Sequence, residues 1–419
     1  MPILHNKENV SSMIVEHNKQ GLIKNIFYAS LYIKIISSII SEIKERISPF
    51  SPIIRNVWRL RLNLWIIKGE EKTTKQEIKI IYMGRDLSRY YVEDLVFSNI
   101  IEEKCIGKKW IWTTLKMARS NCTNSSFLIA ETGDFLAKIF KGKQEYFIPC
   151  WIQGEINLNA NFKGPFKINR NLKNDLRKIK KHKLDYELTN ELVQFNKFYH
   201  DMYTPFATRR YGKKAIVGNY YDLKIAFKKG ELLLVKMGEI PIAGTLIKYM
   251  KKQAFLCVLG IKDGDSDYVG FGAIAALYYY SIKYLKGRGF NRVNIGSTRP
   301  FLTDGVLKYK KKWGLKIVNT SGPGFLINPL SESSAVKDFL LNNPFVFRDS
   351  KHVYGAVFLL PEQIDGQKSI EKIFHDYYID GISKLIIYVF DGTDSIIQMS
   401  MPNELNNKIT ILRADEIFK

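Results

Sequence analysis

The sequence has few of the residues that hold metals or build disulfide scaffolds. Its 419 residues include six histidines without ligand spacing and four cysteines, none of them in a C-x-x-C pair. The cysteines are Cys105, Cys122, Cys150 and Cys257. Wide cysteine spacing is typical of a reducing compartment and argues against a cysteine-based metal site. We therefore expect no bound metal.

Motifs of several large enzyme classes are missing as well. There is no G-K-[ST] phosphate loop, no H-E-x-x-H and no G-x-S-x-G, so metalloprotease and serine-hydrolase chemistry have no support. Residues 263–267 begin like a calcium loop, but Tyr268 takes the glycine position and Ile274 that of the closing glutamate. Residues 270–275 formally fit a dinucleotide fingerprint, yet the next strand ends at Gly296 without the acid that would hold a ribose.

Long apolar runs are also lacking. The most apolar early stretch, Ile26–Ser41, is interrupted by Lys34 and is too short to span a bilayer. The first twenty residues lack the basic-then-apolar pattern of a secretory signal. We predict a cytoplasmic protein. For Ile26–Ser41 we favour a helix packed on the protein, and a helix lying on the inner face of the membrane is the alternative.

What the sequence does have is positive charge. The 64 Lys and Arg residues outnumber 41 Asp and Glu, for a net charge of +23. Such an excess predicts an anionic partner, which includes nucleic acid, a phosphorylated cofactor, an anionic polymer or an anionic membrane surface. A uniformly basic surface with no dedicated partner explains the same excess, and both interpretations stay open at this point.

The most informative stretch is Ala254–Asn319, which predicts strand, loop, helix, strand, loop, helix and strand in turn. The segments are 254–261, 263–272, 273–286, 292–295, 296–305, 306–314 and 315–319. A strand–helix–strand unit this short predicts a right-handed crossover between two parallel strands. The helix that begins after Gly270 and Gly272 leaves its first backbone N–H groups free for a phosphate. In the last helix we expect Lys308 and Trp313 to pack.

Flanking segments are predicted from periodicity. We expect a helix over 90–103 and antiparallel strands over 126–131, 134–140 and 145–152. Three strands should follow residue 231, and a strand–helix–strand pattern should recur at 353–360, 370–378 and 385–389.

The basic segment Lys163–Lys183 predicts a two-sided helix. Leu172, Leu176 and Ile179 share one face, and a basic face carries Lys173, Arg177, Lys180 and Lys181. The basic face is either a nucleic-acid contact or simply a solvated surface.

The pieces VGFGA (Val269–Ala273), NIGSTRPFLTDG (Asn294–Gly305) and YKKKWG (Tyr309–Gly314) resemble the FemAB-like branch of the GNAT N-acyltransferase superfamily. INRNLKNDLRKIKK (Ile168–Lys181) resembles the basic helix that precedes the second half in that branch. The branch includes peptidoglycan-bridge aminoacyltransferases and GNAT-like domains of exopolysaccharide-biosynthesis proteins. The resemblance implies an α/β fold in which helices flank a mixed central sheet.

The resemblance covers the middle of the chain, and composition divides the two ends from it. We predict a helical lead-in over 1–76, a degenerate first GNAT-like half over 77–167, a second GNAT-like acyltransferase half over 168–329, and a small appended α/β domain over 330–419.

The resemblance also implies a site. It places the donor phosphates on Val269, Gly270, Phe271, Gly272 and Ala273, for which an ordinary helix start is the alternative. Asp304 is expected to accept the amine proton and Arg299 to hold an anionic acceptor or the donor phosphates. The alternative for these two is a structural Arg–Asp pair. Tyr211, with Arg209 and Arg210, is expected to line the acceptor site.

The implied activity is transfer of an acyl group from acyl-CoA, with acetyl-CoA the leading donor, to an amine on a small molecule, cell-envelope precursor or polysaccharide precursor. Tyr268 and Val269 stand where the GNAT phosphate loop usually begins with a charged residue, and aminoacyl-tRNA is accordingly the alternative donor. A non-catalytic GNAT-like scaffold that binds RNA or another polyanion through the basic helix is the alternative function.

Overall fold

The computed structural model describes residues 61–110, 112–114, 124–142, 145–159, 170–212, 215–251, 253–349, 352–399 and 405–418. The chain divides into two units, Met1–Arg61 and Leu62–Lys419, and the described residues after Arg61 all belong to the second unit. The expected helix over Ile26–Ser41 and most of the predicted lead-in lie outside the described residues.

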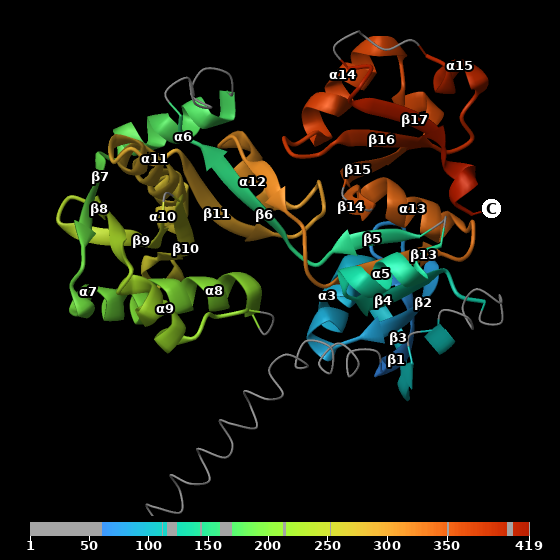
Figure 1. Cartoon of the computed structure of the whole chain (residues 1–419), viewed down its shortest axis with the longest axis horizontal. Coiled ribbons are helices and arrows are strands. Elements are labelled where there is room, and N and C mark those ends of the chain that lie inside the picture. The colour runs from blue at the N-terminus through green and yellow to red at the C-terminus, as the bar shows by residue number, and fades with distance from the viewer. Residues whose placement is uncertain are drawn as a thin grey trace, which may run out of the picture. The chain divides into compact units, whose positions relative to one another are not determined.

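The first sheet has ten strands in the order β17-β16-β15-β14-β5-β13-β4-β2-β1-β3 (Figure 1). The strands are β1 (Arg61–Glu71), β2 (Glu77–Gly84), β3 (Phe97–Trp110), β4 (Phe127–Thr132), β5 (Tyr146–Pro149), β13 (Gly324–Pro329), β14 (Phe345–Asp349), β15 (His352–Leu359), β16 (Lys384–Val389) and β17 (Ile409–Arg413). Its helices are α3 (Asp86–Val96), α5 (Asp134–Phe140), α13 (Ser334–Asn342), α14 (Gly366–Tyr377) and α15 (Asp394–Ile397).

The second sheet has seven strands in the order β12-β6-β11-β10-β9-β8-β7. They are β6 (Ile152–Asn157), β7 (Leu184–Thr189), β8 (Gly230–Met237), β9 (Ile240–Met250), β10 (Gln253–Ile261), β11 (Arg292–Thr298) and β12 (Lys316–Asn319). Its helices are α6 (Arg170–Lys181), α7 (Leu192–Lys197), α8 (Thr204–Tyr211), α9 (Tyr220–Phe227), α10 (Ser266–Gly270), α11 (Ala273–Gly287) and α12 (Gly305–Lys312). A π-helical turn, Phe198–Tyr203, joins α7 to α8.

The predicted α/β fold with helix-flanked mixed sheets is confirmed. Strands β8, β9 and β10 pair antiparallel, and α11 then carries the chain to β11, which pairs parallel with β10 as expected for the crossover. The strand–helix–strand pattern after residue 350 is also present, because β15 and β16 pair parallel.

In two segments the predicted type of element is wrong. The stretch 134–140 is a helix, α5, which starts after Gly133 and has Asp134 in its first turn. The helix expected over 90–103 ends at Val96, and Phe97–Trp110 forms β3 beside β1 at the edge of the first sheet. For β3, pairing with β1 overrides the local helical pattern.

Two strands, β6 and β13, belong to a different sheet from the strand that precedes them in sequence. The run 145–152, expected as one strand, breaks at Cys150 and Trp151, so that β5 joins the first sheet and β6 the second. In return β13, which follows the second sheet in sequence, pairs with β4 and β5 of the first. Strands β14 to β17 continue the first sheet beyond β5. The four-part division of the chain stays a prediction.

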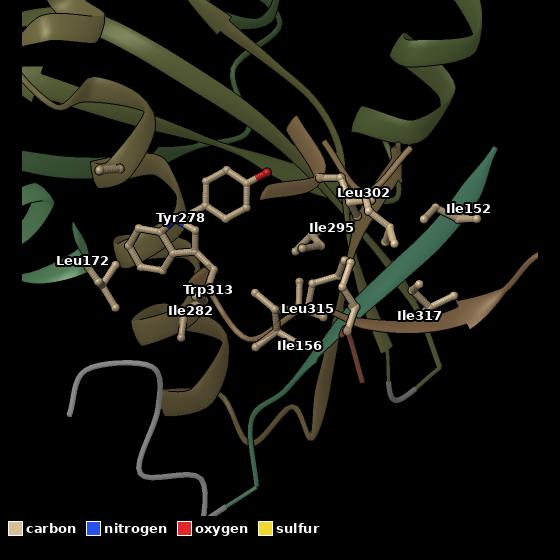
Figure 2. Packing of buried hydrophobic residues seen from close by; sticks show 14 of the residues in the cluster. Ile152, Ile156, Leu172, Tyr278, Ile282, Ile295, Leu302, Trp313, Leu315 and Ile317 are labelled. Atoms are coloured by element: carbon tan, nitrogen blue, oxygen red, sulfur yellow. The ribbon is translucent and has the colours of Figure 1, made fainter. Parts of the chain in front are cut away.

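The second sheet packs on a buried core that positions its loops. Trp313 is fully buried and stacks on Tyr278 of α11, with ring centroids 5.6 Å apart. Ile152 and Ile156 of β6 and Ile295 of β11 belong to the same cluster (Figure 2). Trp313 therefore packs as predicted, whereas Lys308 is exposed.

Candidate functional site

The parallel pairing of β10 with β11 is short. It covers only Gln253–Phe255 against Arg292–Asn294. Directly beyond the last pair each strand has a register shift: β10 between Leu256 and Val258 against β9, and β11 between Asn294 and Ser297 against β6. Bulges bend a strand and increase its twist, which explains why the two strands part here. We call residues 256–259 and 295–298, beyond the last pair, the open ladder.

The residues of the open ladder on β10 are partly accessible. Leu256, Cys257, Val258 and Leu259 are all half-buried, although they lie in the middle of a seven-stranded sheet. A strand edge without a partner presents N–H and C=O groups that an extended ligand can pair with.

Gly296 and Lys310 lie at the start of the open ladder. Gly296 has φ +75, a conformation that side chains rarely adopt, and its N–H donates to Oδ1 of Asn294. The Nζ of Lys310, from α12, donates to the carbonyl oxygen of Ser297 at 3.1 Å. Lys310 is only 5% exposed, and burial lowers its pKa to about 8. The sequence pattern did not single out this lysine, because it begins a run of three lysines, Lys310–Lys312.

The predicted phosphate loop lies against the predicted basic helix. Gly272 has φ +99 and caps α11, and a Cβ placed there would lie 3.0 Å from the Cβ of Lys178 in α6. The ring of Phe271 stacks on His182, with centroids 4.6 Å apart. Two features more than eighty residues apart in sequence thus form one basic surface. No side chain caps the first turn of α11.

Solvent exposure differs among the residues of this loop. Gly270 is exposed, and Val269, Phe271 and Ile274 are half-buried. Ala273 is completely buried, so its N–H does not face solvent. The assignment of Val269–Ala273 to donor phosphates stays a prediction, in which the exposed end of the loop at Gly270 is the accessible part.

The predicted acceptor residues of α8 are exposed. Tyr211 is 48% exposed, and Arg209 and Arg210 lie beside it at the end of the helix. Arg209 packs against the turn before the phosphate loop, because a Cβ on Gly264 would lie 2.9 Å from its Cδ. This places Arg209 near the start of that loop, and the acceptor role of the three residues stays a prediction.

Arg299 and Asp304 form no ion pair with each other. Asp304 caps α12: its Oδ1 accepts from the N–H groups of Val306 and Leu307, both at 2.9 Å. Arg299 instead lies between the rings of Tyr91 and Trp151. The structural Arg–Asp ion pair that was the alternative is therefore not formed between these two residues, and a role for Asp304 as a proton acceptor stays a prediction.

The loop after β11 is fixed by the first sheet. Leu302 N–H donates to the carbonyl of Pro344 at 2.8 Å, and Val346 N–H donates to that of Pro300 at 2.7 Å. A cavity of about 210 Å³ lies between this loop and α3, lined by Lys72, Tyr91, Asp94, Leu95, Phe301, Thr303, Asp304 and Asn343. Residues after 330 thus hold the loop that carries Arg299 and Asp304.

Within the described ranges, no group of three or more His, Cys, Asp or Glu residues is placed to hold a metal ion. Among the helices of the same ranges, none combines the length and apolar character needed to cross a membrane.

No protein-family model and no curated protein matches the chain. Solved structures similar to it include L-PGS from Bacillus licheniformis, at 10% identity and a TM-score of 0.32 over 65% of this chain and 86% of that one. FemX matches at 11% identity and a TM-score of 0.33, over 62% of this chain and 83% of that one. A GCN5-related N-acetyltransferase from Sphaerobacter thermophilus matches at 8% identity and a TM-score of 0.26, over 63% of this chain and 76% of that one. Similarity this low transfers no activity to this chain.

Proposed function

We propose that this chain is an N-acyltransferase that moves an acyl group from a thioester donor, acyl-CoA, to an amine. The observation that carries the proposal is the open ladder, with the buried Lys310 at its start. A pantetheine arm is an extended chain with amide groups, so it can hydrogen-bond to the free edge of β10 as an added strand. This places the thioester near the point where β10 and β11 part.

The chemistry needs little beyond position and proton transfer. The amine nitrogen attacks the thioester carbonyl carbon, the C–N bond forms, and the tetrahedral intermediate collapses with cleavage of the C–S bond. The amine loses one proton and the departing thiolate takes up one. With its pKa lowered to about 8 by burial, Lys310 is partly neutral near pH 8 and can relay that proton. Placing amine and thioester side by side supplies much of the rate enhancement.

The donor phosphates are assigned to the basic surface at the start of α11. Gly270 is the exposed part of the loop, and Lys178 and His182 of the α6 segment lie alongside. Gly270 ends α10, and the positive charge of Lys178 beside the loop favours an anionic group such as phosphate. The acceptor class, an amine of a cell-envelope or polysaccharide precursor, rests on the FemAB-like resemblance, and aminoacyl-tRNA stays the alternative donor.

Thermal unfolding with acetyl-CoA, a longer acyl-CoA and bulk aminoacyl-tRNA tests the donor. At a hundred times its dissociation constant, a donor should stabilise the fold by about 2.7 kcal/mol. Lys178→Glu should abolish most of the acyl-CoA shift, because it reverses a charge beside the loop. Lys229→Gln, which removes an exposed charge before β8, is the matched control. Stabilisation by aminoacyl-tRNA alone would replace acyl-CoA as donor, and no stabilisation by any of the three would contradict the proposal.

One observation supports the alternative of an RNA-binding scaffold. In α6, Leu172 and Ile179 are buried while Lys173, Arg177, Lys180 and Lys181 are exposed, as the two-sided pattern predicts. Changing these four basic residues to glutamine should lower RNA affinity and flatten its dependence on salt if the basic face binds phosphates. Unchanged RNA binding would identify the charge as general surface charge.

A further inference from the structure

We propose that Arg299 binds an anionic group, a phosphate or carboxylate, carried by the amine acceptor. This inference rests on the proposed acyl transfer and adds to it the class of acceptor: a small amine that also bears a negative charge.

The first argument is geometric. The guanidinium carbon of Arg299 lies 3.5 Å from the ring centroid of Tyr91 and 3.9 Å from that of Trp151. An arginine that stacks on aromatic rings keeps the N–H donors at the edge of its planar group available. Of the five N–H donors on that edge, one at Nη1 reaches the carbonyl oxygen of Cys150 at 3.4 Å. The remaining donors are held in one plane, the arrangement that matches the oxygens of a phosphate or carboxylate.

The second argument is charge balance. Among the described residues no carboxylate lies within ion-pair distance of Arg299. The nearby Arg85 is matched by Glu131, whose carboxylate accepts from Nε of Arg85 at 2.7 Å and from its main-chain N–H at 3.0 Å. The Cys150 thiol stays neutral, because burial raises its pKa to about 12. Asp304 attracts Arg299 through space but caps α12. Arg299 is half-buried and has no ion-pair partner among the described residues, so its charge is only weakly screened by solvent.

The third argument is position. Arg299 follows β11 directly, three residues after Gly296 in the open ladder. At about 3.3 Å per residue the Cα of Arg299 lies within about 10 Å of that of Gly296, where the strands part. One end of a small acceptor can therefore be held at Arg299 while its amine faces the thioester. Trp151 is 40% exposed, so the aromatic wall is open to solvent on one side.

The test uses three small amines that end in a phosphate, a carboxylate or a hydroxyl: O-phosphoethanolamine, β-alanine and ethanolamine. Their affinities for the full chain are measured by titration calorimetry, with acetyl-CoA titrated separately. We expect at least one anionic amine to bind the wild type ten times more tightly than ethanolamine. Arg299→Gln should remove that tenfold preference, and Arg299→Lys should recover only part of it because an ammonium lacks the planar fork. Lys229→Gln should leave it unchanged.

Two outcomes overturn the inference directly: equal affinity of the wild type for the three amines, or an unchanged preference in both Arg299 variants. A third outcome also overturns it: if the variants lose acetyl-CoA binding but keep amine binding, Arg299 belongs to the donor site. A wild type that prefers an anionic amine through Arg299 but binds no acyl donor would support the anion site and contradict the proposed transfer. Far-ultraviolet circular dichroism of each variant, with Arg299→Lys as the milder change, separates lost binding from lost folding.

Discussion

Three consecutive lysines in α12 have three different environments. Lys310 is buried and donates to Ser297, while Lys311 donates to the carbonyls of His375 and Asp376 at 2.6 and 2.8 Å, at the end of α14. Lys312 pairs with Asp175 of α6. The sequence contains only a basic run, in which all three residues are equivalent candidates for a solvated face. Their separation depends on which strand or helix each one faces, and this is why sequence patterns missed Lys310.

If Lys310 relays the proton, its removal should slow transfer at saturating donor. We expect Lys310→Met to lower kcat at least about 100-fold, the usual contribution of a positioned acid or base. In the wild type kcat should rise with pH and level off above about 8, and the variant should lack that rise. Lys308→Met, an exposed change on the same helix, is the control. An unaltered pH profile in Lys310→Met would assign the proton transfer to another group.

The same burial should appear in stability. The pKa of Lys310 is lowered from 10.5 in the unfolded chain to about 8 in the folded one. Below pH 8 both states hold the proton and the wild type carries the full penalty of a buried charge, about 3 kcal/mol. Between pH 8 and 10.5 the unfolded chain binds more protons, so wild-type stability should rise relative to Lys310→Met. Urea unfolding of both proteins from pH 7 to 10.5 measures this difference, and parallel curves would contradict it.

At the scale of elements, the sequence predicted those segments whose periodicity is long and whose contacts are local. The helix 273–287 and the three strands before it are regular and well bounded, and all were predicted. The failures lie at 97–110, whose strand is paired with β1, and at 134–140, a helix of only seven residues. The phosphate loop and basic helix were both predicted from sequence, but their contact at Gly272 and Lys178 was not.

The backbone conformation of Gly296 in the open ladder should require a glycine. Its φ of +75 is strained for any residue with a Cβ, although the nearest atoms to such a Cβ are 3.7 Å away. We expect Gly296→Ala to destabilise the fold by about 1–2 kcal/mol through backbone strain alone. Gly305→Ala in α12 is the matched control, since it meets no atom within 4 Å and improves helix propensity. Thermal unfolding of both variants measures the difference in stability. Equal stabilities would contradict the expected backbone strain at Gly296.

At the scale of the molecule, the membership of β6 in the second sheet and of β13 in the first determines which fragments of the chain can fold. Strand β6 lies between β11 and β12 in the second sheet, yet it precedes the predicted boundary at residue 168. Local periodicity carries no information about this pairing, which joins segments more than a hundred residues apart. The predicted second half, taken alone, therefore lacks an interior strand of its sheet.

We therefore expect a fragment of residues 150–323 to fold and a fragment of residues 168–323 to fail. The longer piece holds all seven strands of the second sheet, whereas the shorter one leaves β12 without its partner and exposes one edge of β11. Proton NMR line dispersion and cooperative urea unfolding of the two fragments test this. Equal folding of both would mean that β6 is dispensable.

Strand β5 has all four residues buried, and its two neighbours, β13 and β14, both follow residue 323. On a ribosome that adds about 5–20 residues per second, β5 emerges roughly ten to thirty seconds before either partner exists. During that interval the nascent chain must complete most of its second sheet while an apolar strand of the first has nothing to pair with. Biosynthesis of this protein therefore includes a waiting period in which a chaperone has a defined target, the segment Tyr146–Pro149.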